Sequence, residues 1–82
     1  RHHLTREEVA GTIEDFLLGR GGDWDWDDFI SIPIDYDPYL EGIRLKCGGL
    51  PDEYPPAKGQ RAYCTAEGMR VLREMLEELR GD

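Results

Sequence analysis

The segment GGDWDWDDFI, residues 21–30, holds both tryptophans, one of the two phenylalanines and four of the nine aspartates of the chain. It lies in an acidic region, because residues 14–41 contain nine acids and one base, a net charge of −8. The rest of the chain contains nine acids and nine bases, so the whole formal charge of −8 is concentrated in this region. We take this acidic, aromatic segment as the centre of the molecule.

The acidic segment is compatible with a helix or a strand. Asp23 is suited to cap a short helix, since its carboxylate can accept hydrogen bonds from the exposed amides at the positive end of the helix dipole. Trp26, Phe29 and Ile30 then share one face. The alternation of Trp and Asp over residues 24–27 also fits a strand, but a lone strand has no obvious partner in this chain. We therefore expect a short helix.

Three longer helices are predicted around this segment. Their starts are marked by Thr5 with Glu8 as a capping box, by Asp37 before Pro38, and by Thr65. Their ends are marked by glycines at residues 19–22, at 48–49 and at 81, so the first helix should cover residues 6–18. Each contains an apolar stripe at helical spacing, strongest in the last helix. In the first helix the stripe consists of Val9, Ile13, Phe16 and Leu17.

Prolines shape the expected connections. Pro33 should fix an extended segment over residues 31–36, from which Ile32 and Ile34, with the preceding Ile30, can fill the core. Residues 50–56, with three prolines, should form a turn and an extended segment. The sequence thus predicts an all-α fold for residues 1–82, a small single-domain bundle of three main helices plus one short helix with extended, Pro-containing connections.

The composition argues against several classes of protein. With a pI near 4.6, the chain lacks the excess of Lys and Arg that neutralises phosphates, so we expect no nucleic-acid partner. No apolar run approaches the roughly 18 residues of a membrane span, and no signal-peptide pattern opens the chain. We therefore expect a cytoplasmic protein without a membrane partner. Cys47 and Cys64 should be reduced, half-buried thiols, and a disulfide between them stays open if the domain is exported.

Sequence motifs for metal binding and catalysis are incomplete. Aspartates at alternate positions begin an EF-hand, but counted from Asp23 the sixth position is Asp28 instead of glycine, and the twelfth is Ile34 instead of glutamate. Residues 19–22 lack the Lys and the Ser or Thr of a phosphate loop. Histidine occurs only at residues 2–3, so neither cysteine has an obvious general base. We expect no enzyme, no cofactor and no metal ligand, with weak cation binding by the aspartates left open.

The tryptophans indicate a recognition surface. On a helix, Trp24 and Trp26 point about 200° apart, so one of them should be partly exposed. An exposed Trp among aspartates is typical of binding sites, where aromatic residues supply contact area and charges attract a basic partner. The alternative is that both rings enlarge the core. The predicted partner-binding residues are Asp23, Trp24, Asp25, Asp27 and Asp28, with Asp35 and Asp37 at the rim.

Three motifs together resemble a group of small acidic bacterial proteins without an established function: DWDWDDF at residues 23–29, DPYLEGIR at 37–44 and LPDEYPP at 50–56. The resemblance spans most of the chain. Such proteins are similar in size and charge, and in nothing more specific, to immunity proteins that neutralise secreted toxins.

We therefore expect a non-enzymatic acidic protein-binding module, such as an immunity or inhibitor protein for a basic toxin or nuclease. One alternative is a structural or regulatory homo-oligomeric subunit, with a homodimer packed through the last helix. A third hypothesis is a weak hydrolase that depends on a divalent metal.

Overall fold

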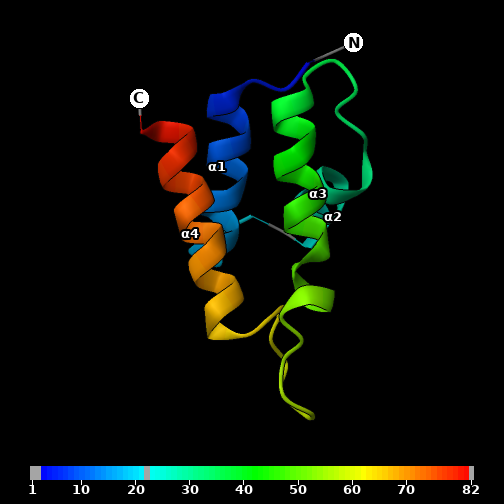
Figure 1. The fold of residues 1–82 in the computed structure, drawn as a ribbon, viewed down its shortest axis with the longest axis vertical. Helices are drawn as coiled ribbons and strands as arrows, with labels where there is room; N and C mark the ends of the chain where they lie inside the picture. The colour runs from blue at the N-terminus through cyan, green and yellow to red at the C-terminus, as the bar shows by residue number, and fades with distance from the viewer. Residues whose placement is uncertain (1–2, 22, 82) are drawn as a thin grey trace.

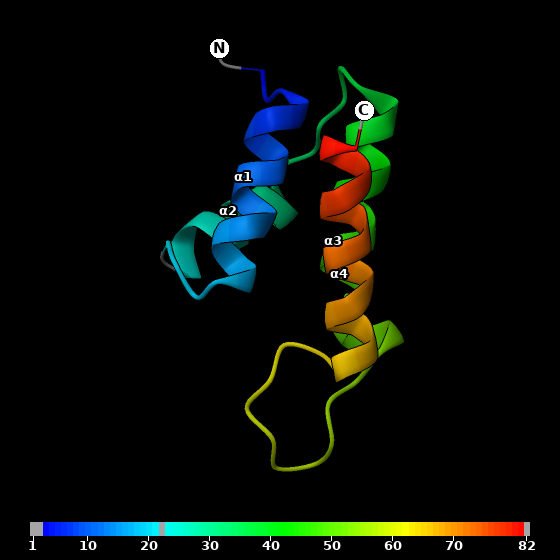
Figure 2. The same ribbon diagram turned by 90° about the vertical axis from the view of Figure 1, so that its left-hand side faces the viewer.

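The computed structural model describes residues 3–21 and 23–81, without the side chains of Asp23 and Trp24. This part of the chain contains four helices: α1 (Arg6–Leu17), α2 (Asp23–Ser31), α3 (Pro38–Glu53) and α4 (Ala66–Arg80) (Figure 1). Each of α1 and α3 packs against both α2 and α4, so the four helices surround one core. Figure 2 shows α1 and α2 on one side of the molecule and α3 and α4 on the other. The all-α prediction is confirmed.

The predicted caps are present at three helices. The Thr5 hydroxyl accepts from the Glu8 amide at 3.2 Å, and the Glu8 carboxylate accepts from the Thr5 amide at 3.0 Å, which completes the capping box. Asp37 and Thr65 cap α3 and α4, each by accepting from the amide three residues later. Asp23, by contrast, is the first residue of α2 and not its cap, so this helix begins one residue earlier than predicted. An acid in the first turn also suits the helix dipole.

The end of α3 differs from the prediction. The helix continues through the glycines at 48–49 and through Pro51, although we expected the glycines to end it. Pro51 has no N–H to donate to the carbonyl of Cys47, four residues earlier. The hydroxyl of Tyr63 donates to that carbonyl instead, at 2.8 Å. Leu50, fully buried, anchors the last turn in the core. These interactions outweigh the low helix propensity of the glycines at 48–49, each of which disfavours the helix by only about 1 kcal/mol.

A loop between Tyr54 and Thr65 projects from one end of the helices (Figure 2). The predicted non-helical segment, residues 50–56, is therefore helical in its first half. The amide of Thr65 donates to the carbonyl of Tyr54 at 3.0 Å, so the two ends of the loop are joined. Gly59, with φ of 88°, forms a turn at the tip, in a backbone region that favours glycine.

The core receives side chains from all four helices and from the connection between α2 and α3. Its large, fully buried members are Val9, Ile13, Ile34, Leu40, Cys47, Leu50 and Leu72. Ile34 enters the core from the α2–α3 connection, as predicted. Ile32, from which we expected the same, is 51% exposed. The predicted extended segment over residues 31–36 is only partly present, because Ser31 belongs to α2 and residues 35–36 form a turn.

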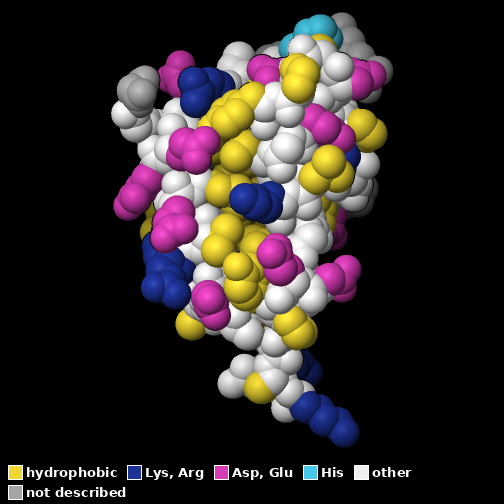
Figure 3. All heavy atoms as spheres, in the orientation of Figure 1, with side chains coloured by type: hydrophobic (Ala, Val, Ile, Leu, Met, Phe, Trp, Pro, Cys, Tyr) yellow, Lys and Arg dark blue, Asp and Glu magenta, His cyan; other side chains and the backbone are white. Residues whose placement is uncertain are grey.

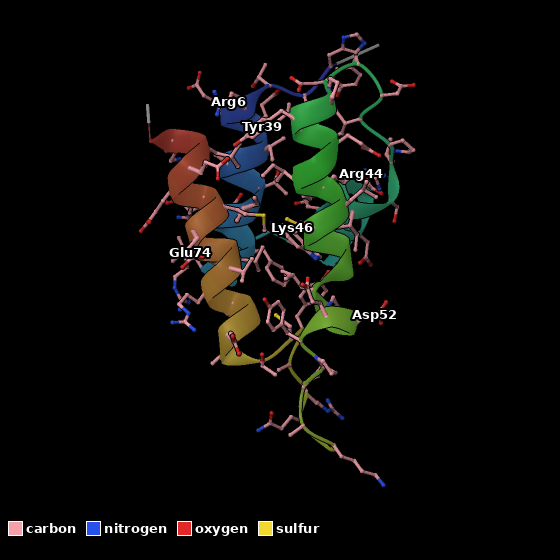
Figure 4. The ribbon with its side chains drawn as sticks, in the orientation of Figure 1. Arg6, Tyr39, Arg44, Lys46, Asp52 and Glu74 are labelled. Atoms are coloured by element: carbon pink, nitrogen blue, oxygen red, sulfur yellow. The ribbon has the colours of Figure 1, made fainter. Side chains whose placement is uncertain are left out.

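A partly buried ion pair between Arg44 and Glu41 attaches this connection to α3. The side chain of Arg44 extends from α3 toward α2 (Figure 4), and the residue is only 9% exposed. Its guanidinium makes two hydrogen bonds to the Glu41 carboxylate, at 2.7 and 2.6 Å, and donates to the carbonyl of Ile30 at 2.6 Å. Glu41 also accepts from the Ile34 amide at 2.7 Å. A cation at the C-terminal end of α2 also suits the dipole of that helix.

Contacts among Arg6, Tyr39 and Glu78 link the ends of α1, α3 and α4. The Arg6 guanidinium lies over the Tyr39 ring, 4.8 Å from its centroid (Figure 4). The Tyr39 hydroxyl donates to Glu78 at 2.7 Å, and this hydrogen bond raises the pKa of Tyr39. The contact is exposed, so it stabilises the fold only modestly.

Candidate functional site

Trp26 is the centre of an aromatic cluster beside α1. Its ring is 5% exposed and stacks on Phe16 of α1, with centroids 4.0 Å apart. Phe29 lies at 5.5 Å in a tilted arrangement, and Tyr63, near the end of the projecting loop, meets the ring edge-on at 5.8 Å. Such aromatic pairs contribute about 0.5–1.5 kcal/mol each beyond their buried area. Trp26 therefore packs in the core and joins α1, α2 and the loop.

A cleft of about 430 Å³ lies between α1, α2 and the segment that follows α2. We call it the α1–α2 cleft. Its apolar walls are formed by Phe16, Trp26, Phe29, Ile32, Pro33 and Ile34. Leu4 and Tyr36 also line it, and the Tyr36 hydroxyl accepts a hydrogen bond from the Leu4 amide at 2.6 Å. This bond connects the segment before α1 to the segment after α2. Cavities of this size and character commonly bind ligands.

Four charged side chains line the same cleft: Asp15, Arg20, Asp25 and Asp28, with a combined charge of −2. Arg20 pairs with Asp15 at 3.2 Å, but both side chains are at least half exposed, so the pair contributes only about 0–1 kcal/mol. Asp25 is exposed and Asp28 is half-buried. Within residues 3–21 and 23–81, neither of these two carboxylates has a hydrogen-bond or ion-pair partner. As far as the described residues show, the cleft therefore combines apolar walls with two negative charges that have no partner.

A smaller cavity, of about 350 Å³, adjoins the same tryptophan and includes Asp27 and Tyr63. Among the described side chains, the indole N–H of Trp26 is the one buried polar group without a hydrogen-bond partner. Burial raises the pKa of Tyr63 and the nearby indole N–H opposes this rise, although the two groups do not meet the geometry of a hydrogen bond. An unpaired buried donor typically costs about 1–3 kcal/mol.

The other predicted binding residues are spread more widely. Asp35 is exposed in the α2–α3 connection and lines neither cavity. Asp37 caps α3, where its carboxylate accepts from the Leu40 amide at 3.1 Å. The side chains of Asp23 and Trp24 lie outside the described part of the structure. The structure thus brings Asp25 and Asp28 together at the α1–α2 cleft and places Asp27 at the smaller cavity beside Trp26.

Sequence reasoning missed the apolar half of this site. Phe16 was expected only as part of the core stripe of α1, and Ile32 only as a core residue. Arg20 was expected only within a helix stop. The local sequence does not separate Ile32 from the buried Ile34, because both flank Pro33, whose restriction of the neighbouring backbone does not decide which side chain is buried.

The two cysteines lie in the core and not at the cleft. Both are free and buried, which corrects our expectation that they are half-buried. Burial raises the pKa of Cys47 to about 12 and also raises that of Cys64. Because the thiolate is the reactive form, both thiols are poorly suited to nucleophilic chemistry.

The described residues include no group of three or more His, Cys, Asp or Glu side chains arranged to hold a metal ion. In the same part of the chain, no helix has the length and apolar character needed to cross a membrane. Comparison of the chain with protein-family models, with curated proteins and with solved structures finds no match.

Proposed function

We propose that the protein is a non-enzymatic protein-binding module that receives a basic partner at the α1–α2 cleft and along the neighbouring acidic residues of α2. The observation that supports this most is the pairing of apolar walls with the carboxylates of Asp25 and Asp28, which have no partner among the described residues. Residues 14–41 carry a net charge of −8, which should accelerate the encounter with a basic protein. A basic toxin or nuclease is the natural ligand, because an acidic surface can occupy a site built for phosphate.

A comparison of two charge-reversal variants tests this proposal. We expect Asp25→Lys with Asp28→Lys to abolish capture of a basic protein from a lysate of the source cell. The matched control is Asp52→Lys with Glu74→Lys, which makes the same change in charge at exposed positions of α3 and α4 (Figure 4). Circular dichroism should show that both variants remain folded. Equal capture by the wild type and both variants would contradict the proposal.

One observation favours a second candidate function, that of a homo-oligomeric subunit. On the face formed by α3 and α4, hydrophobic side chains form a strip between acidic and basic ones (Figure 3). A homodimer packed through α4 would cover such a strip. The dependence of the association rate on salt concentration distinguishes the two candidates. A complex steered by charge associates more slowly as the ionic strength rises, whereas apolar association does not.

A further inference from the structure

We propose that the α1–α2 cleft is an anchor pocket for one large apolar side chain of the partner, in a segment whose neighbouring Lys or Arg pairs with Asp25 and Asp28. This inference rests on the proposed function and specifies what the partner must present. The preferred occupant is thus a short, exposed segment that carries an aromatic or branched aliphatic residue next to a cation.

The walls of the cleft account for the apolar part of this occupant. At about 430 Å³, the cleft is near the lower end of the range of ligand cavities, which fits a side chain or a short segment. Ile32 lines it while remaining 51% exposed, so an apolar ligand would remove a large hydrophobic side chain from water. Phe16 and Trp26 offer rings against which an aromatic side chain can pack.

The rim accounts for the cationic part. Asp25 and Asp28 are three residues apart on α2, so they lie on neighbouring turns of one face. Asp15 already has Arg20 as a partner, whereas these two carboxylates have none in the described residues. A purely apolar ligand would exclude water from them without supplying a compensating charge, which is unfavourable. Only an occupant that is both apolar and cationic satisfies the walls and the rim together.

Capped tripeptides test the two requirements separately. Lys-Trp-Lys should bind at the cleft. Lys-Ala-Lys should bind about tenfold more weakly or worse, since burying one large apolar side chain contributes about 1.5–3 kcal/mol. Glu-Trp-Glu should also bind more weakly than Lys-Trp-Lys, since its carboxylates are repelled by Asp25 and Asp28. Binding is followed through the amide and indole N–H signals in NMR titrations. Trp24→Phe identifies the indole signal of Trp26, which should shift on binding.

Two matched variants locate the binding. Ile32→Ser should weaken Lys-Trp-Lys binding several-fold, whereas Leu45→Ser, on α3 and 58% exposed, should leave it unchanged because Leu45 does not line the cleft. Equal affinity for Lys-Trp-Lys and Lys-Ala-Lys would overturn the inference, as would equal effects of the two variants. The proposed function would survive either result if the reversal of Asp25 and Asp28 still abolished partner capture.

A second copy of the chain is the alternative occupant, because the projecting loop contains Lys58 and Arg61 and no acid. Sedimentation at increasing protein concentration tests this. Self-association that disappears in the Lys58→Glu, Arg61→Glu variant, and that Lys-Trp-Lys inhibits, would assign the cleft to that loop and overturn the inference. A monomer at all concentrations supports it.

Discussion

Replacement of Tyr63 by Phe should destabilise the protein through a single hydrogen bond. The Tyr63 hydroxyl donates to the carbonyl of Cys47, which belongs to a fully buried residue and cannot be paired by Pro51. Tyr63→Phe keeps the ring but removes this donor from a buried carbonyl, so the free energy of unfolding should fall by about 1–3 kcal/mol. In a domain of this size, each kcal/mol lowers Tm by about 4–8 °C. Urea and thermal unfolding followed by circular dichroism measure both quantities.

A second substitution separates the hydrogen bond from other effects of the missing hydroxyl. Pro51→Ala supplies an amide that can donate to the same carbonyl, as in an uninterrupted helix. Tyr63→Phe should therefore cost less in the Pro51→Ala background, by about 1 kcal/mol or more, and the double-mutant cycle gives this difference directly. An identical loss of stability in both backgrounds would refute the idea that Tyr63 replaces the donor that Pro51 lacks.

Two further predictions concern the fold. Because Arg44 and the Ile34 amide hold the pKa of Glu41 at about 2, against an ordinary 4.5, its ionised form stabilises the fold fully above pH 4.5 and progressively less as the pH falls to about 2. The urea midpoints of wild type and Glu41→Gln should therefore converge across that window, and a constant difference would contradict this role. Gly68→Ala should destabilise by about 1–3 kcal/mol, since its Cβ would lie 2.7 Å from the Cys64 sulfur. Gly42→Ala should instead stabilise by about 0.5–1 kcal/mol, since its Cβ would meet nothing within 4 Å beyond its chain neighbours and the backbone of its own helix. Thermal melts that rank these two variants in the opposite order would disprove the packing argument.

The sequence predicts the features of this fold that depend on near neighbours. The Thr5, Asp37 and Thr65 caps each involve an amide three residues away, so the residues that decide each cap lie within one helical turn of sequence. The end of α3 cannot be predicted in this way, because it depends on Tyr63, which lies 16 residues from the carbonyl that it satisfies. The low helix propensity of the glycines at 48–49 predicts a helix end there, and this local preference takes no account of the distant Tyr63 hydroxyl.

The candidate site follows the same division. Asp25 and Asp28 can be selected from composition, because acids beside aromatic residues are visible in the sequence. The cleft itself is lined by Phe16 of α1 and Ile32 of the α2–α3 connection, and only tertiary packing brings these two residues to one cavity. Asp37 is acidic and nearby in sequence, but its carboxylate is engaged in capping α3.

The joined ends of the loop between Tyr54 and Thr65 make this loop a natural place for the chain to change in length. Because the two ends already meet through a backbone hydrogen bond, each doubling of the length between them costs only about 0.6 kcal/mol in closure entropy. Residues 55–62 line neither described cavity. Related chains can therefore acquire insertions near Gly59, and a reporter peptide can be grafted there, without altering the surface that we propose meets the partner.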